Sequence, residues 1–259
     1  MPFAESARIQ FENNPLVEVI CQLRFPPILS IAAEEPATFQ DRIRSTYPLY
    51  SLEEQSALPA EIVESLKNFP LKLGKQSDHR FTTENEKRIV TLNKAFLALM
   101  DFDYLRWTDF KNELDSVREA VEDTYEPSFY TRVGLRYRNA IVREDLGLEG
   151  TPWERLINPS LTGLLGVSDV CDYVTEAQGK TVIRLDEVEG GFVTLRQGLG
   201  MVDDRLAYLI DADFFTTTKQ EAPNVPGILD IFNRLNGNLF RWAIRDELRD
   251  ALQPLEISS

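Results

Sequence analysis

Arginine residues on the polar faces of alternating segments are the side chains of this sequence with the clearest potential for recognition chemistry. In residues 129–142, apolar side chains such as Val133 and Leu135 occupy every second position, and arginines stand between them. This period of two predicts a β-strand with one buried face, so the arginines of such strands collect on the other face. Guanidinium groups form planar, paired hydrogen bonds with carboxylates and phosphates. We therefore expect a partner- or ligand-binding surface whose members are Arg24, Arg132, Arg136, Arg138, Arg184 and Arg196.

A second interpretation of the same arginines is structural. Cross-strand pairs with carboxylates such as those of Glu18, Asp186 and Glu187 would contribute about 0.2–1 kcal/mol each. The sequence leaves both interpretations open. Alanine substitution of Arg136 and Arg138 separates them, because lost binding with unchanged folding indicates a binding surface, whereas lost stability alone indicates pairing.

Two carboxylates, Asp211 and Asp213, lie two residues apart in another predicted strand. Alternate residues of a strand share one face and are about 6.5–7 Å apart. Such a pair can bind Mg²⁺ when a phosphate completes the coordination shell. The simpler interpretation is that these carboxylates face solvent or serve as partners for the arginines.

The remaining candidates for catalysis or metal binding are few. The chain has two cysteines, Cys21 and Cys171, and one histidine, His79, which are too few for a zinc site of four Cys and His ligands. We expect two reduced, buried thiols. His79 lies in the polar segment 75–80, which we interpret as a turn with an exposed histidine. Motifs for a phosphate-binding loop, a dinucleotide site or a serine nucleophile are not found, so we expect no catalytic residue, metal or cofactor.

Composition narrows the classes of function. The 259 residues are 43% hydrophobic and 27% charged, which is typical of a globular protein, and the net charge is −14. This charge disfavours general nucleic-acid binding because it repels phosphate backbones. The sequence contains no apolar run of about 18 residues and no apolar signal-peptide core near its start, so we expect a cytoplasmic protein with no membrane contact.

Periodicity favours an α+β fold in which antiparallel sheet is covered on one face by two long helices. We divide the chain into an N-terminal α+β half, 1–146, and a C-terminal β-meander with a long helix, 147–259, which together form one compact unit. Residues 47–60 are expected to form a loop. The predicted strands are 16–25, 80–83, 87–92, 95–99, 129–142, 170–177, 180–188, 191–198 and 205–215, and the predicted helices are 34–46, 60–68, 109–125, 151–157 and 225–250.

Four segments carry a resemblance to a known family: NPLVEVICQLRF, FTTENEKRIVTLNKAFLALMDFDYLRWTDF, FYTRVGLRYRNAI and LDIFNRLNGNLFRWAI. They resemble a sporadically distributed, functionally uncharacterised family of bacterial proteins of about the same length. The resemblance implies no catalytic residues. The patchy distribution of the family suits genes that travel with antiphage defence or toxin–antitoxin modules.

These observations lead to two expectations of function. The first is a non-enzymatic binding or regulatory protein that acts by contact with another protein chain or with a second copy of itself. The second is a sensor or enzyme that binds a phosphorylated small molecule or nucleotide on the arginine-lined sheet face. A stable complex with a neighbouring gene product favours the first, and thermal stabilisation by nucleotides or polyphosphate favours the second.

Overall fold

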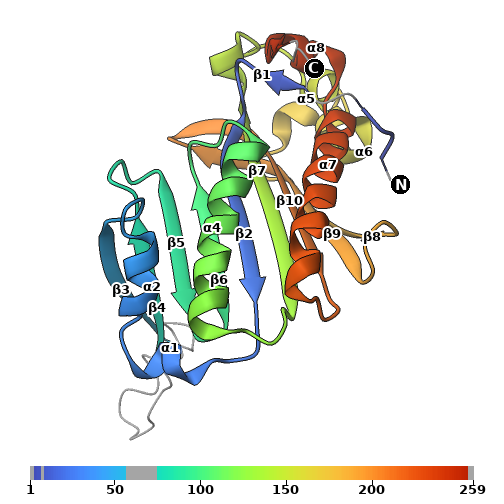
Figure 1. The fold of residues 1–259 in the computed structure, drawn as a ribbon. Coiled ribbons are helices and arrows are strands. Elements are labelled where there is room, and N and C mark those ends of the chain that lie inside the picture. The colour runs from blue at the N-terminus through green and yellow to red at the C-terminus, as the bar shows by residue number, and fades with distance from the viewer. Residues whose placement is uncertain (1–2, 7–8, 57–74, 256–259) are drawn as a thin grey trace, which may run out of the picture. The chain divides into compact units, whose positions relative to one another are not determined.

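The computed structural model describes residues 3–6, 9–56 and 75–255 (Figure 1). Contacts divide the chain into two compact units: unit 1 comprises Met1–Ile20 and Arg132–Ser259, and unit 2 comprises Cys21–Thr131. Strand β2 (Leu16–Arg24) contributes its first residues to unit 1 and its last to unit 2. The division predicted after residue 146 falls inside unit 1 and remains a prediction.

Unit 1 is built on an antiparallel sheet in the order β2, β7, β10, β9, β8. A separate pair of short strands, β1 and β11, joins residues from the two ends of the chain. The elements of unit 1 besides β2 are β1 (Gln10–Phe11), β7 (Arg132–Val142), α5 (Trp153–Leu156), α6 (Pro159–Thr162), β8 (Gln178–Leu185), β9 (Gly191–Val202), β10 (Arg205–Thr216), α7 (Val225–Ala243), α8 (Asp246–Ala251) and β11 (Pro254–Leu255).

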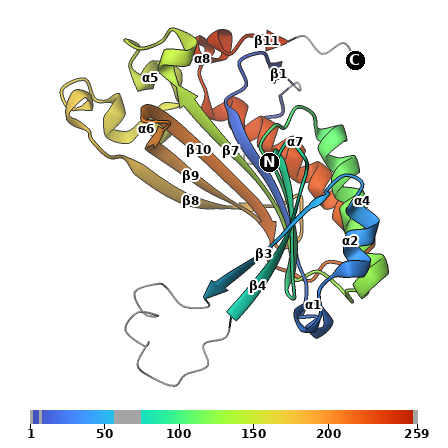
Figure 2. The same ribbon diagram turned by 90° about the vertical axis from the view of Figure 1, so that its left-hand side faces the viewer.

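The core of unit 1 lies between α7 and one face of β7 and β10 (Figure 2). The rings of Phe232 on α7 and Phe214 on β10 are both fully buried, with their centroids 5.8 Å apart. The hydroxyl of Tyr137 on β7 donates a hydrogen bond of 2.9 Å to Oδ1 of Asn233 on α7. These contacts hold the apolar face of the strands against the helix, as the alternation of β7 predicts.

Unit 2 has a sheet in the order β3, β4, β5, β6, followed by the last residues of β2. Its long helix lies along the strands (Figure 1), and its apolar side chains Phe110, Leu114, Val117 and Val121 are buried. The elements are α1 (Leu29–Ala33), α2 (Ala37–Ile43), β3 (Leu49–Ser56), β4 (Lys75–Thr82), β5 (Arg88–Asn93), β6 (Phe96–Asp101) and α4 (Trp107–Tyr125).

A buried polar network fastens α4 to the strands of unit 2. The hydroxyl of Tyr47 donates to Oε1 of Glu113 on α4, and Nη1 of Arg88 on β5 donates to the other oxygen, Oε2, at 2.7 Å. Nε of Arg88 also donates to Asp101 on β6 at 3.1 Å. Burial, and then the hydrogen bond with Glu113, raise the pKa of Tyr47 above its ordinary value. Tyr47 therefore stays protonated and remains a donor to the carboxylate.

The α+β class and the large antiparallel sheet content are confirmed. Both 19-residue helices, α4 and α7, are present, but each packs on the strands of its own unit, and coverage of one common face remains a prediction. The final helix is shorter than predicted, since it stops at Ala243. None of the described helices is long and apolar enough to cross a membrane.

Two of the sequence predictions were wrong for part of the chain. Residues 170–177 form no strand and contain a 3₁₀ turn at Cys171–Tyr173. The expected loop at 47–60 contains strand β3 instead. The predicted helix at 60–68 lies outside the described residues.

His79 is not in an exposed turn, because it lies within strand β4 and only 5% of its surface is exposed. Its Nδ1 atom is 3.1 Å from the hydroxyl of Tyr50, and the two rings are stacked. Burial lowers the pKa of His79, although a hydrogen bond with the backbone of Ile31 and the charges of Asp78 and Glu35 oppose this shift. The neutral ring is therefore the form that the fold holds.

This environment predicts a pH dependence of stability. The pKa of His79 is lower in the folded than in the unfolded chain, so its contribution is complete above the unfolded value of about 6.5 and is lost as the pH falls below it. We expect His79→Gln to lose less stability than the wild type between pH 7.5 and pH 5.5. Urea unfolding of both proteins at these two pH values measures the difference. Equal losses in the two proteins would contradict this assignment.

Candidate functional site

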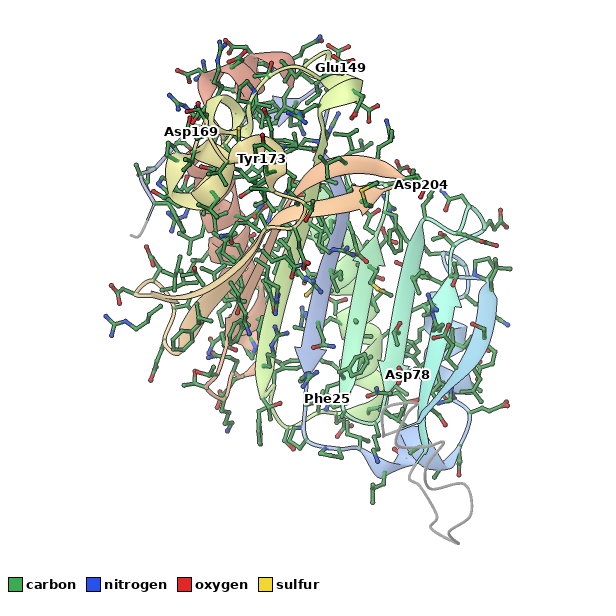
Figure 3. The ribbon with its side chains drawn as sticks, turned by 180° about the vertical axis from the view of Figure 1, so that it is seen from behind. Phe25, Asp78, Glu149, Asp169, Tyr173 and Asp204 are labelled. Carbon is green, nitrogen blue, oxygen red and sulfur yellow. The ribbon has the colours of Figure 1, made fainter. Side chains whose placement is uncertain are left out.

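Three arginines of β7 lie on the sheet face of unit 1 that points away from α7. Arg132, Arg136 and Arg138 alternate with the buried residues that pack against the helix, such as Val133 and Leu135. Figure 3 views the sheet from behind, on the side opposite α7. The period-two pattern thus places these guanidinium groups as the sequence predicts.

The register of the strands extends this surface across the sheet. Lys180 on β8 is directly opposite Arg196 on β9, Arg196 is opposite Asp211 on β10, and Asp211 is opposite Arg138 on β7. Directly opposite residues of antiparallel strands share a face. We use the name arginine face for the surface formed by Glu18, Arg132, Arg136, Arg138, Lys180, Arg196, Asp211 and Asp213.

Asp211 is the carboxylate with the most partners on the arginine face. Nε and Nη2 of Arg136 donate to its two oxygens, each at 2.6 Å, which is the bidentate geometry that suits a guanidinium group. Nη1 of Arg196 reaches Oδ2 of the same carboxylate at 3.5 Å. The hydrogen bonds with Asp211 raise the pKa of Arg136, which outweighs its desolvation. Arg136 is therefore a fixed positive charge and not a proton donor.

The two outer carboxylates of the arginine face hold one arginine each. Arg138 donates from Nη1 to Oε2 of Glu18 on β2 at 2.6 Å, and Arg132 donates from Nη2 to Oδ1 of Asp213 at 2.8 Å. The acid is the buried member of the first pair, since the side chain of Glu18 is 8% exposed and that of Arg138 is 47% exposed. In this pair the carboxylate thus lies beneath the guanidinium group, which faces solvent.

Gly134 makes room for the side chain of Arg132. A Cβ atom at Gly134 would lie 2.1 Å from Nη1 of Arg132. The guanidinium group passes over this glycine and sits 5.0 Å from the ring centroid of Phe215, which is directly opposite Gly134 on β10. Cation–π contact and the ion pair with Asp213 together fix its position.

The arginine face carries more positive than negative charge. Its five cations face three carboxylates, and all three carboxylates already hold an arginine. Within the described part of the chain, Lys180 forms no ion pair, and its opposite neighbour is another cation, Arg196. Opposed like charges destabilise a strand pair, so this end of the row favours an external anion.

The six arginines predicted from sequence do not all belong to this surface. Arg132, Arg136, Arg138 and Arg196 are brought together. Arg184 lies on the same side of β8, but it pairs with the exposed Asp186 at 3.2 Å.

Arg24 belongs to unit 2, where its Nε donates to Gln22 at 2.9 Å. Lys180 was not among the residues predicted for this surface, although the strand predicted at 180–188 placed it four residues before Arg184 and hence on the same face.

The arrangement explains the paired aspartates. Asp211 and Asp213 are bound to arginines, which is the simpler of the two interpretations of their spacing. Among the described residues, no group of three or more His, Cys, Asp or Glu side chains is placed to hold a metal ion. Cys21 is buried as predicted, but Cys171 is partly exposed, so that prediction was wrong for Cys171, and neither forms a disulfide within the described residues.

Fold and surface together define an α+β protein with a helix on one face of an antiparallel sheet and a lattice of ion pairs on the other. No protein-family model matches the chain, and no curated protein sequence matches it.

Proposed function

We propose that this chain is a non-enzymatic binding or regulatory protein of the cytoplasm, and that the arginine face contacts acidic side chains of a partner protein. The observation that carries this proposal is the excess of positive charge at one end of the row, where Lys180 stands opposite Arg196 and Arg196 shares the carboxylate of Asp211 with Arg136, which holds it in a bidentate pair. In a protein with a net charge of −14, such a local excess of positive charge is a specific feature and not a consequence of composition.

The mixture of charges favours a protein partner over a phosphorylated small molecule. A phosphate site concentrates several cations and backbone N–H groups on one anion. On the arginine face, Glu18, Asp211 and Asp213 are interleaved with the guanidinium groups and would repel a nearby phosphate. Alternating charges spread over several strands suit the electrostatic complementarity of a protein interface.

Charge reversal tests the proposal. We expect the double variant Lys180→Glu/Arg196→Glu to bind its partner at least tenfold more weakly than the wild type, since it replaces attraction by repulsion at the end of the row with excess positive charge. The control is Arg155→Glu/Lys219→Glu, which changes the net charge equally at two exposed positions of unit 1 outside the arginine face. The measurement is co-purification after co-expression with the products of adjacent genes, followed by titration calorimetry of any complex formed.

Three outcomes decide between the functions. Binding that is lost in the first variant and retained in the control supports the proposal. Equal binding by wild type and both variants contradicts it. A rise in melting temperature of the wild type with ATP or tripolyphosphate, lost in Lys180→Glu/Arg196→Glu, would instead support the phosphate-binding alternative. The link to defence or toxin–antitoxin modules rests on the family resemblance, and the identity of the adjacent genes tests it.

A further inference from the structure

Strand β8 is the outer edge of the sheet in unit 1. It pairs with β9 without interruption from Gln178 to Leu185, and no strand of the described residues pairs with its other side (Figures 1 and 2). Alternate residues of an edge strand direct their N–H and C=O groups away from the sheet. β8 therefore offers a row of backbone donors and acceptors to an incoming strand.

The side chains of β8 leave this edge accessible. The strand is eight residues long and contains no proline, and Lys180, Thr181, Val182 and Arg184 are exposed. Val182 is 55% exposed although it is β-branched and lies in the middle of the strand. Long, regular edges of this kind are used for strand addition, in which main-chain hydrogen bonds supply affinity and alternate side chains supply specificity.

We propose that an extended segment of the partner adds to β8 as a further strand. It would carry acidic side chains at two positions four residues apart, opposite Lys180 and Arg184, and an apolar side chain between them, opposite Val182. This inference rests on the proposed function and names the part of the partner that the charged surface recognises.

The charges of β8 select an acidic segment. Lys180 has no ion pair within the described residues, so a carboxylate opposite it gains a partner without displacing one. Arg184 would have to give up its ion pair with Asp186 in order to pair with the incoming segment. Both side chains are about three-quarters exposed, and such surface ion pairs contribute little to stability. Lys180, Val182 and Arg184 share one face of β8 because they are alternate residues. An acidic–apolar–acidic pattern with a period of two is thus complementary to them.

A second copy of this chain fits the edge less well. Two β8 strands related by a twofold axis through Val182 would place Lys180 of each copy opposite Arg184 of the other. Like charges directly opposite each other destabilise the pair. The edge is therefore suited to a different chain with acidic side chains.

The probe for this proposal is the synthetic peptide Thr-Glu-Thr-Val-Thr-Glu-Thr with blocked ends. Its sequence reads the same in both directions, so it samples parallel and antiparallel addition. We expect binding to slow amide hydrogen exchange in residues 178–185 of the full chain, measured by mass spectrometry. Replacement of both glutamates by glutamine, or their placement on opposite faces in Thr-Glu-Thr-Val-Glu-Thr-Thr, is expected to weaken binding at least tenfold.

N-methylation of the peptide tests backbone hydrogen bonding separately from side-chain contacts. Adjacent residues of a strand direct their N–H groups to opposite edges. Of two peptides N-methylated at the valine or at the threonine after it, one is expected to lose binding and the other to keep it. Equal binding of the two would show contact through side chains only and would overturn strand addition.

The variant Lys180→Gln/Arg184→Gln is expected to bind the peptide at least tenfold more weakly. If these charges only guard the edge against self-association, the variant will form dimers or larger species in light scattering and peptide binding will be unchanged, which overturns the proposal. A partner that still binds this variant but is lost with Lys180→Glu/Arg196→Glu would overturn strand addition alone. If both variants still bind that partner, the proposed function is contradicted as well.

Discussion

Phe232→Ala is expected to lower the free energy of unfolding of unit 1 by about 3–5 kcal/mol, which is the usual cost of truncating a buried phenylalanine. Phe232 is fully buried at the centre of α7, and its ring meets that of Phe214 on β10. Alanine would remove this contact and leave a cavity between helix and sheet, because α7 is held on both sides of the site by other buried residues, Leu229 and Leu235.

The measurement is urea unfolding followed by circular dichroism, with hydrogen exchange to locate the loss. Exchange should accelerate in α7, β7 and β10 before it does in unit 2. Leu164→Ala is the control, because this side chain is 61% exposed in unit 1 and its truncation should change stability by less than about 0.5 kcal/mol. A decrease in the free energy of unfolding of less than about 1 kcal/mol for Phe232→Ala would show that α7 does not pack closely on the sheet at this position.

Glu113→Ala should destabilise unit 2 by about 3 kcal/mol. Removal of this carboxylate leaves the buried hydroxyl of Tyr47 without its acceptor and takes from Arg88 one of its two acidic partners. Breaking a buried ion pair from one side costs about 3–5 kcal/mol. We place the effect at the lower end, because Arg88 is one-third exposed and retains its contact with Asp101.

A double substitution tests whether the loss of stability comes from a hydrogen-bonding group left without its partner. Glu113→Leu/Tyr47→Phe removes the carboxylate together with the buried hydroxyl that donates to it, while Arg88 keeps Asp101, so it is expected to recover part of the stability that Glu113→Ala loses. Urea midpoints of the single and double variants give the coupling between the two residues. If the double variant is as unstable as the sum of the single ones, Glu113 and Tyr47 act independently and this description of the network is wrong.

The elements that the sequence predicted well are those with an unbroken local pattern. β2, β7 and α4 were predicted within a few residues of their observed bounds, because alternation or helical spacing runs through the whole of each. The end of the last helix was not predictable in this way. No glycine or proline stands near Ala243, and the chain leaves the helix where Ile244 forms a β-bridge with Ile157, a contact made by tertiary structure.

For the candidate site residues, the sequence predicted the face of the strand on which each one lies, but not which residues contact one another. Alternation placed Arg136 and Arg138 on one side of their strand, but it could not show which strands become neighbours. The partners Glu18 and Asp211 come from strands 120 and 75 residues away in the chain, and the order of the sheet brings them into contact. His79 was misplaced for a related reason, since the polar residues around it suggested a turn, whereas it lies in a strand that pairs with β3 on one side and β5 on the other.

The discontinuity of unit 1 affects the order in which a newly translated chain can fold. All residues of unit 2 have been synthesised by position 131, so this unit is able to form while translation continues. The contacts of Ser6 with Asn238 and of Gln10 with Leu255 cannot form until residues 238 and 255 have been synthesised. Ser6, Gln10 and Phe11 therefore leave the ribosome long before their partners, and during that time chaperones can bind them as an unpaired segment.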